Sequence, residues 1–226
     1  MAKTRDLWVF AYGSLMWRPG FPYVQAAHAR LIGWRRSFCI YSRYHRGSMR
    51  RPGLVLGLDR GGLCEGMAFR VPGEDAAATL EYLREREQII SVYREALVPV
   101  TLLSGERPEV MALAFLVERA HPSYAGELSL CEQAHLIRGA RGRSGSNIDY
   151  LMSTLAHLKE LGIRERAMER LLGMVGANVL HGDHGARCSG RTPQLLEGVR
   201  TRPVRVRPLR PEDAQRFAYR TVLGVR

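Results

Sequence analysis

The stretch from Leu7 to Trp17 reads LWVFAYGSLMW, and the rest of the chain is organised around it. Its first seven residues carry no charge and favour extended structure, which is typical of a strand buried on both faces. Gly13 and Ser14 then form a turn signal directly after the strand. Because glycine has no Cβ, a ligand can approach main-chain N–H groups that a side chain would cover. The stretch predicts either a plain turn or a turn that binds a carboxylate or an oxyanion.

The composition is that of an ordinary globular protein. The 226 residues are 46% hydrophobic and 25% charged, and a chain of this length can bury one sizeable core. No apolar run approaches the roughly 18 to 20 residues that span a bilayer, and the N-terminus lacks the pattern of a secretory signal. We therefore expect a cytoplasmic protein that does not enter a membrane.

The cysteines do not indicate a metal site. Cys39, Cys64, Cys131 and Cys188 show neither zinc-ligand spacing nor a Cys-x-x-Cys pair. The sequence therefore predicts no metal and no redox motif.

The formal net charge is +12, and all of the 34 basic residues except Lys3 and Lys159 are arginine. Such residues can neutralise phosphates and supply sequence-independent affinity for nucleic acid. The arginines are scattered, however, and aromatic residues do not alternate with them as they do on a base-stacking surface. A positive surface also attracts a small anionic substrate. Nucleic-acid binding is therefore kept only as a distant alternative.

The hydrophobic pattern predicts hairpins first and helices later. We expect extended segments at 7–13 and 29–41, a hairpin of strands 54–58 and 63–71 around a turn, and a second hairpin of strands 96–103 and 110–117. The helical pattern covers 74–90, 129–140, 147–161 and 164–174, with Asn147 as the N-cap of the third helix. This order indicates an α+β domain with a curved mixed or antiparallel sheet, or a small barrel, surrounded by helices.

The first predicted helix carries one glutamate on its apolar face. Position 87 completes the apolar stripe of this helix, whose other members are Ala76, Leu80, Leu83 and Ile90. Glu87 is therefore expected to point inward, whereas Glu81 and Glu85 fall elsewhere on the helix. Burial disfavours the charged form of a carboxyl and raises its pKa, which suits a group that transfers protons. The alternative is that Glu87 lies at the edge of the stripe and pairs with Arg86 or another arginine.

Further motifs accompany these two features in a recognisable order. They are Tyr12-Gly13-Ser14-Leu15, His45-Arg46-Gly47, Arg51-Pro52-Gly53, Tyr82 to Glu87, Tyr93-Arg94, His121 to Tyr124, and Ser144 to Leu151. Their order resembles that of the γ-glutamylcyclotransferases, and the setting of Tyr-Gly-Ser-Leu resembles the ChaC branch, which acts on glutathione. The resemblance covers roughly residues 7 to 175.

The resemblance implies a γ-glutamylcyclotransferase-like fold in which Glu87 is the catalytic acid and base. It also implies that the glutamyl part of the substrate is held by Ala11, Tyr12, Gly13, Ser14, Leu15 and Met16. Arg46, Tyr93 and Tyr124 are expected to contact the substrate as well. A cationic loop from Arg46 to Arg51 can meet the glycyl carboxylate of glutathione. Ala11 departs from the family, which usually has glycine there.

The implied reaction agrees with the residue types. In a γ-glutamyl peptide the α-amine can attack its own γ-carbonyl, so the enzyme needs neither a catalytic triad nor a nucleophilic cysteine. It needs an acid and base, for which Glu87 is the candidate, and donors for the oxyanion, for which the N–H groups of Gly13 to Leu15 are candidates. No cofactor is required. The expected products are 5-oxoproline and cysteinylglycine, and the alternative substrates are other γ-glutamyl amines or amino acids.

The C-terminal segment lies outside the resemblance. We expect residues 1–178 to form the γ-glutamylcyclotransferase-like domain and residues 179–226 to form a basic extension. This extension contains Val199, Val204, Leu209 and Phe217, so we expect part of it to pack on the domain rather than remain disordered.

Overall fold

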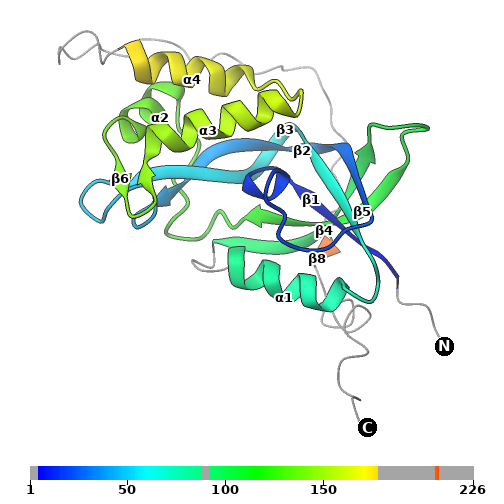
Figure 1. Ribbon diagram of the computed structural model, residues 1–226. Helices are drawn as coiled ribbons and strands as arrows, with labels where there is room; N and C mark the ends of the chain where they lie inside the picture. Colours follow the sequence, from blue (N-terminus) through cyan, green and yellow to red (C-terminus); the bar gives the residue numbers. More distant parts are fainter. Residues whose placement is uncertain (1–4, 88–91, 178–206, 209–226) are drawn as a thin grey trace. The chain divides into compact units, whose positions relative to one another are not determined.

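The computed structural model describes residues 5–87, 92–177 and 207–208 (Figure 1). The chain divides into two compact units. The first comprises Met1–Arg36, Leu58–Glu118 and Thr201–Arg226, and the second comprises Ser37–Gly57 and Arg119–Arg200. Two long strands, β2 and β3, each contribute residues to both units.

The secondary structure alternates between strands and helices along the chain. The strands are β1 (Leu7–Ala11), β2 (Gln25–Ser42), β3 (Gly53–Val71), β4 (Tyr93–Leu102), β5 (Glu109–Val117), β6 (Arg141–Gly142), β7 (Gly145–Ser146) and β8 (Arg207–Pro208). The helices are the 3₁₀ turn η1 (Ser14–Met16), α1 (Ala76–Glu87), α2 (Leu130–Ile137), α3 (Asn147–Glu160) and α4 (Arg166–Ala177).

The first unit is built on a mixed sheet that closes on itself. The strand order is β2-β3-β1-β5-β4, and β4 pairs in turn with β2, where Leu102 lies opposite Ala29. β1 runs antiparallel to β3 and parallel to β5. Closure of a sheet removes its exposed edges and encloses a core of inward side chains. The predicted α+β class with a curved mixed sheet or small barrel is confirmed.

β1 is buried on both faces, as its apolar run predicts. Leu7, Val9, Phe10 and Ala11 are each at most 2% exposed. The strand ends at Ala11, two residues before the predicted end, and the chain then enters η1. The turn after the buried strand is therefore confirmed, and it begins slightly earlier than expected.

The predicted hairpin within residues 54–71 is wrong, because this segment is the single strand β3. Gly61 and Gly62 have φ values of +96° and +71°, which side-chain-bearing residues rarely adopt. The left-handed geometry is thus accommodated within the strand instead of reversing it. Asp59, expected in an exposed turn, is 1% exposed and lies 3.3 Å from the guanidinium of Arg35 on β2. The strand pairing along β2 outweighed the local turn signal.

The helices follow the predicted pattern with shifted ends. In α1, Ala76, Leu80 and Leu83 are buried as the stripe requires, and Ile90 lies outside the described residues. α1 lies beside β4, to which Arg84 is joined by two hydrogen bonds to Glu95 of 2.8 and 2.9 Å. In the second unit α4 packs against α2 and α3. None of the described helices is both long enough and apolar enough to cross a membrane.

Asn147 is not the N-cap of α3, as the sequence predicts, but its first residue. Ser146 caps the helix, because its hydroxyl accepts a hydrogen bond from the N–H of Asp149 at 3.0 Å. The Asn147 side chain is completely buried and pairs with the backbone of Leu54 in β3. Its Oδ1 accepts the Leu54 N–H at 2.6 Å, and its Nδ2 donates to the Leu54 carbonyl at 2.7 Å. The side-chain amide of Asn147 thus makes the two backbone hydrogen bonds to Leu54 that a neighbouring strand could make.

Most of the predicted C-terminal extension lies outside the described residues. Its described part, Arg207–Pro208, forms β8 and pairs antiparallel with Ala96 and Leu97 of β4. Packing of the remaining extension on the domain stays a prediction.

The buried amide of Asn147 leads to a stability prediction. Asn147→Ala removes both partners of the Leu54 backbone, and each buried polar group left without a partner costs about 1–3 kcal/mol. Since two such groups of Leu54 are affected, we expect the free energy of unfolding, measured by urea denaturation, to fall by about 2–6 kcal/mol.

Ser146→Ala is the matched control at the adjacent position. It removes only a helix cap, which is worth about 1 kcal/mol. An Asn147→Ala protein that is as stable as the Ser146→Ala protein would show that the Leu54 pairing is not important.

Candidate active site

The loop after β1 presents its backbone on an open side. In η1 the N–H of Met16 donates to the carbonyl of Gly13 at 2.9 Å, and the side chains of Leu15 and Met16 are buried. Gly13 occupies the N-cap position and has no side-chain oxygen to offer the first N–H groups of the turn. A Cβ at Gly13 would meet no atom within 4 Å. The backbone at Gly13 is therefore approachable.

A buried arginine holds the other side of this loop. Arg36 of β2 is 7% exposed, and its Nε donates to the carbonyl of Tyr12. Its Nη2 donates to the carbonyl of Glu65 at 2.6 Å and lies 3.9 Å from Sδ of Met16. These contacts tie the start of the loop to β2 and β3. We did not predict Arg36, although the alternation of buried Trp34 and Phe38 around it marks an inward position.

Glu87 is the last described residue of α1, and its side chain is largely buried with 18% exposure. Burial raises the pKa of its carboxyl above the ordinary value, while the positive charge of Arg86 lowers it by less. The Nε of Arg86 lies 3.5 Å from Oε1 of Glu87. By contrast, Glu85 is exposed. Both readings of the sequence thus hold in part, because Glu87 is largely buried and is also paired with Arg86.

Arg86 joins Glu87 to the loop. Its Nη2 donates to the hydroxyl of Ser14 at 3.0 Å, and its Nη1 donates to the carbonyl of Arg18 at 2.8 Å. The two features that the sequence singled out, the turn at Gly13 and Ser14 and the carboxyl of Glu87, are therefore connected through one guanidinium. The sequence identified Arg86 only as a possible ion-pair partner.

The other predicted site residues occupy several places. Ala11 and Tyr12 are buried where β1 ends, and Tyr93 begins β4 opposite Val117. Arg46 and Tyr124 belong to the second unit.

Within the second unit, Arg46 is engaged by its own neighbourhood. Its Nη1 donates to the carbonyls of Ser144 and Ser146, and its guanidinium lies 5.1 Å from the centre of the Tyr150 ring. Tyr124 forms an isolated bridge with Ile40. The substrate contacts expected for Arg46, Tyr93 and Tyr124 stay predictions.

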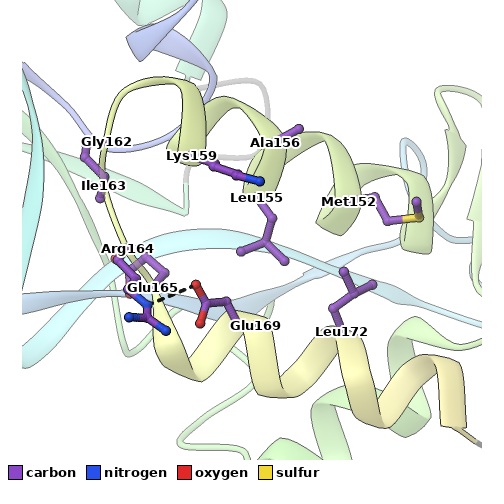
Figure 2. A pocket seen from close by; sticks show the side chains of 10 residues that line it. All are labelled: Met152, Leu155, Ala156, Lys159, Gly162, Ile163, Arg164, Glu165, Glu169 and Leu172. Atoms are coloured by element: carbon purple, nitrogen blue, oxygen red, sulfur yellow. Dashed lines mark ion pairs between the residues drawn. The ribbon is translucent and has the colours of Figure 1, made fainter.

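A pocket of about 590 Å³ lies elsewhere, between α3 and α4 (Figure 2). Figure 2 shows Met152 and Leu155 of α3 and Leu172 of α4 along its wall. Arg164 and Glu169 form an ion pair of 3.5 Å at its side, and both side chains are exposed. None of the predicted site residues lines this pocket. Lys159 and Glu165 also line this pocket.

No cluster of potential metal ligands occurs in the described parts of the chain. There, no three His, Cys, Asp or Glu side chains lie close enough together to hold a metal ion. Glu87 and the loop offer a carboxyl, which can transfer protons, and main-chain N–H groups, which can donate hydrogen bonds.

Comparison with known proteins gives concordant matches. The family model described as ChaC-like protein matches residues 7–178. The glutathione-specific gamma-glutamylcyclotransferase of Escherichia coli is 34% identical over 166 residues, which cover 74% of this chain and 71% of that protein. The human glutathione-specific gamma-glutamylcyclotransferase 1 is 35% identical over 175 residues, which cover 76% and 78%.

A solved structure also resembles the fold. The yeast gamma-glutamyl cyclotransferase specific to glutathione superposes with a TM-score of 0.70 at 23% identity, covering 79% of this chain and 99% of that one. At this identity the likeness concerns the fold, and the family assignment depends on the sequence matches. Because the family model matches residues 7–178, the chain belongs to the family of ChaC-like proteins.

Proposed function

We propose that this chain is a glutathione-specific γ-glutamylcyclotransferase, which converts glutathione into 5-oxoproline and cysteinylglycine. The E. coli and human relatives bear that name, and the matches span most of their length. The observation that carries the proposal is the largely buried carboxyl of Glu87, joined through Arg86 to the loop that begins at Gly13. A proton carrier next to an approachable backbone is what this reaction requires.

The substrate supplies its own nucleophile. The α-amine nitrogen of the glutamyl group attacks its γ-carbonyl carbon, and a C–N bond closes a five-membered ring. The amide bond to cysteine then breaks, and its electron pair stays on the departing nitrogen. Because both reacting groups belong to one molecule, the enzyme gains mainly by holding them in the reactive geometry. No water, metal or organic cofactor enters this balance.

Glu87 is assigned both proton transfers. A free α-amine has a pKa of about 8 and is mostly protonated at neutral pH, so a base must first take its proton. The carboxylate of Glu87 accepts that proton and delivers it to the departing nitrogen of cysteinylglycine. The α-nitrogen becomes positively charged on attack and gives up a second proton by the same route, so the lactam keeps one N–H and cysteinylglycine leaves as an ammonium. Partial burial favours this double role, because it raises the pKa of the carboxyl towards the working pH.

The loop of residues 11 to 16 is assigned to the glutamyl group. Its main-chain N–H groups from Gly13 to Leu15 are the candidates to donate to the oxyanion or to the α-carboxylate. Arg36 supports this loop from behind and leaves the open side at Gly13 unobstructed. Arg46, Tyr93 and Tyr124 are proposed as further substrate contacts. The reaction is proposed to take place in the cytoplasm, which cell fractionation can test.

The proposal is tested by incubating the purified protein with glutathione and measuring 5-oxoproline and cysteinylglycine by mass spectrometry. We expect equal amounts of the two products. A γ-glutamyl amino acid without cysteinylglycine serves as the comparison substrate, and its preferential conversion would replace the glutathione assignment. Absence of 5-oxoproline from every γ-glutamyl substrate would contradict the proposed activity.

The role of Glu87 gives a direct kinetic prediction. Glu87→Gln keeps the shape of the side chain but cannot carry a proton, so kcat for glutathione should fall by roughly 10² to 10⁴. Binding of glutathione, measured by calorimetry, should persist. Glu85→Gln is the control on the same helix, and it should be nearly neutral because Glu85 is exposed. Full activity in the Glu87→Gln protein would remove Glu87 from the mechanism.

The same substitution predicts a pH-dependent change in stability. Well below the ordinary carboxyl pKa, Glu87 is protonated in both the folded and unfolded states and has no net effect. As the pH rises towards the raised folded-state pKa, the unfolded chain releases the proton first, so Glu87 lowers the free energy of unfolding. Glu87→Gln should therefore be more stable than the wild type at pH 7 and lose that advantage in acid. Urea unfolding across this range measures the difference, and a constant difference would contradict the burial effect.

A further inference from the structure

One guanidinium contacts three parts of the proposed site. Arg86 reaches the loop of residues 13 to 18, the side chain of Tyr82 one turn earlier on α1, and the carboxyl of Glu87. We infer that Arg86 is a positioning residue, which ties the substrate loop to α1 and holds the carboxylate of Glu87 next to that loop. This inference rests on the proposed function, since it assigns a role within that reaction.

On the loop side, Arg86 contacts the first residue of η1 and a carbonyl two residues beyond its end. Its Nη2 donates to the hydroxyl of Ser14, the first residue of η1, at 3.0 Å. Its Nη1 donates to the carbonyl of Arg18 at 2.8 Å, and the Arg18 N–H donates to the carbonyl of Ser14 at 2.9 Å. Among the main-chain N–H groups proposed to meet the substrate, that of Leu15 lies between these anchors, that of Ser14 belongs to the first anchor, and that of Gly13 directly precedes it. Their direction therefore depends on where the guanidinium sits.

On the helix side, Tyr82 contacts both Arg86 and the segment that follows η1. Its hydroxyl accepts a hydrogen bond from Nη1 of Arg86 at 2.8 Å, and its ring packs edge-on against Phe21 with centroids 6.4 Å apart. A side chain at Gly20, where φ is +75°, would collide with the same hydroxyl. The segment from Ser14 to Phe21 is therefore seated on α1 through Tyr82 and Arg86 together.

The third contact is electrostatic. Nε of Arg86 lies 3.5 Å from Oε1 of Glu87, and its charge opposes the effect of burial on the pKa of that carboxyl. The other cation in the last turn of α1, Arg84, is paired with Glu95 of β4 through two hydrogen bonds. Arg86 therefore keeps a larger fraction of Glu87 ionised, which is the form that can accept the proton of the substrate amine.

Lysine cannot reproduce this arrangement. A guanidinium is a planar fork with five donors, whereas an ammonium is a compact point charge on a flexible stem. Arg86→Lys thus retains the charge next to Glu87 but cannot bind Ser14, Tyr82 and the Arg18 carbonyl simultaneously. Arg86→Met removes both the charge and the hydrogen bonds. The two variants separate the electrostatic effect from the positioning effect.

The experiment compares wild type, Arg86→Met and Arg86→Lys by two measurements. The first is kcat/KM for glutathione as a function of pH, and the second is the NMR titration of the ¹³C-labelled carboxyl of Glu87, assigned with Glu87→Gln. Arg86→Met should lose about 10²-fold in kcat/KM at neutral pH, as expected when reacting groups are misplaced. The titration midpoint of Glu87 should move to higher pH. Arg86→Lys should restore the midpoint but not kcat/KM.

Arg84→Met is the matched control, because it removes an arginine from the same turn of α1 together with its pairing to Glu95. It should lower stability yet leave the Glu87 midpoint and kcat/KM within about twofold of wild type. Equal midpoints and equal kcat/KM in wild type and Arg86→Met would overturn the inference. So would an Arg84→Met protein that reproduces the Arg86→Met changes in both measurements.

Two further outcomes are also informative. If circular dichroism shows that Arg86→Met is unfolded, Arg86→Lys decides, since reduced kcat/KM with an unchanged midpoint supports positioning and wild-type kcat/KM refutes it. If the wild type fails to convert glutathione, the proposed function fails instead. The NMR titrations of the variants still test the coupling of Arg86 to Glu87 in that case.

Discussion

Pairing of β1 on both sides is the constraint on which the proposed site depends. β1 is hydrogen-bonded to β3 on one side and to β5 on the other, and the pairing with β3 ends at Ala11 opposite Met67. Where a buried strand leaves its ladder, its carbonyls lose their partners and need others. Arg36 is such a partner, because its guanidinium donates to the carbonyl of Tyr12, directly after β1. The same guanidinium also donates to the carbonyl of Glu65 in β3. The exit of the chain from the sheet thus determines where the loop begins.

The loop is then held by two cations from different elements. Arg36 approaches it from β2, and Arg86 approaches it from α1. Hydrogen bonds from charged donors contribute about 1.5–3 kcal/mol each, which helps to offset the cost of removing a guanidinium from water. Arg86 donates to the hydroxyl of Ser14 and the carbonyl of Arg18 as well as lying next to the carboxyl of Glu87. Its charge is therefore shared among several acceptors and offsets the charge of Glu87 only in part. That sharing is consistent with a carboxyl whose pKa remains raised.

Local patterns in the sequence predicted the elements better than their connections. The apolar run of β1 and the apolar stripe of α1 are short-range patterns; the run is confirmed, and the stripe is confirmed at Ala76, Leu80 and Leu83. The hairpin within β3 failed, because glycines that usually mark turns were accommodated inside a long strand. Asn147 failed as a cap, because its amide found a partner in Leu54, 93 residues away. Pairings over such separations leave no local signal.

The candidate site shows the same division. Glu87 could be found because one helix period distinguishes an inward position from its neighbours. Arg36 and Arg86 were missed as supports, since arginine is usually an exposed residue and its buried contacts depend on distant chain segments. Ser14 and Arg86 are 72 positions apart, so only the folded chain joins them.

The choice of arginine for both supports has a consequence for how the protein responds to acidity. A guanidinium stays protonated throughout the range in which proteins remain folded. The framework of the loop, held by Arg36 and Arg86, therefore keeps its charge and its donors while the carboxyl of Glu87 gains or loses a proton. Titration of the proposed proton carrier is in this way separated from the integrity of its surroundings. In the proposed reaction, Glu87 can thus gain and lose a proton while the hydrogen bonds of Arg36 and Arg86 to the loop stay in place.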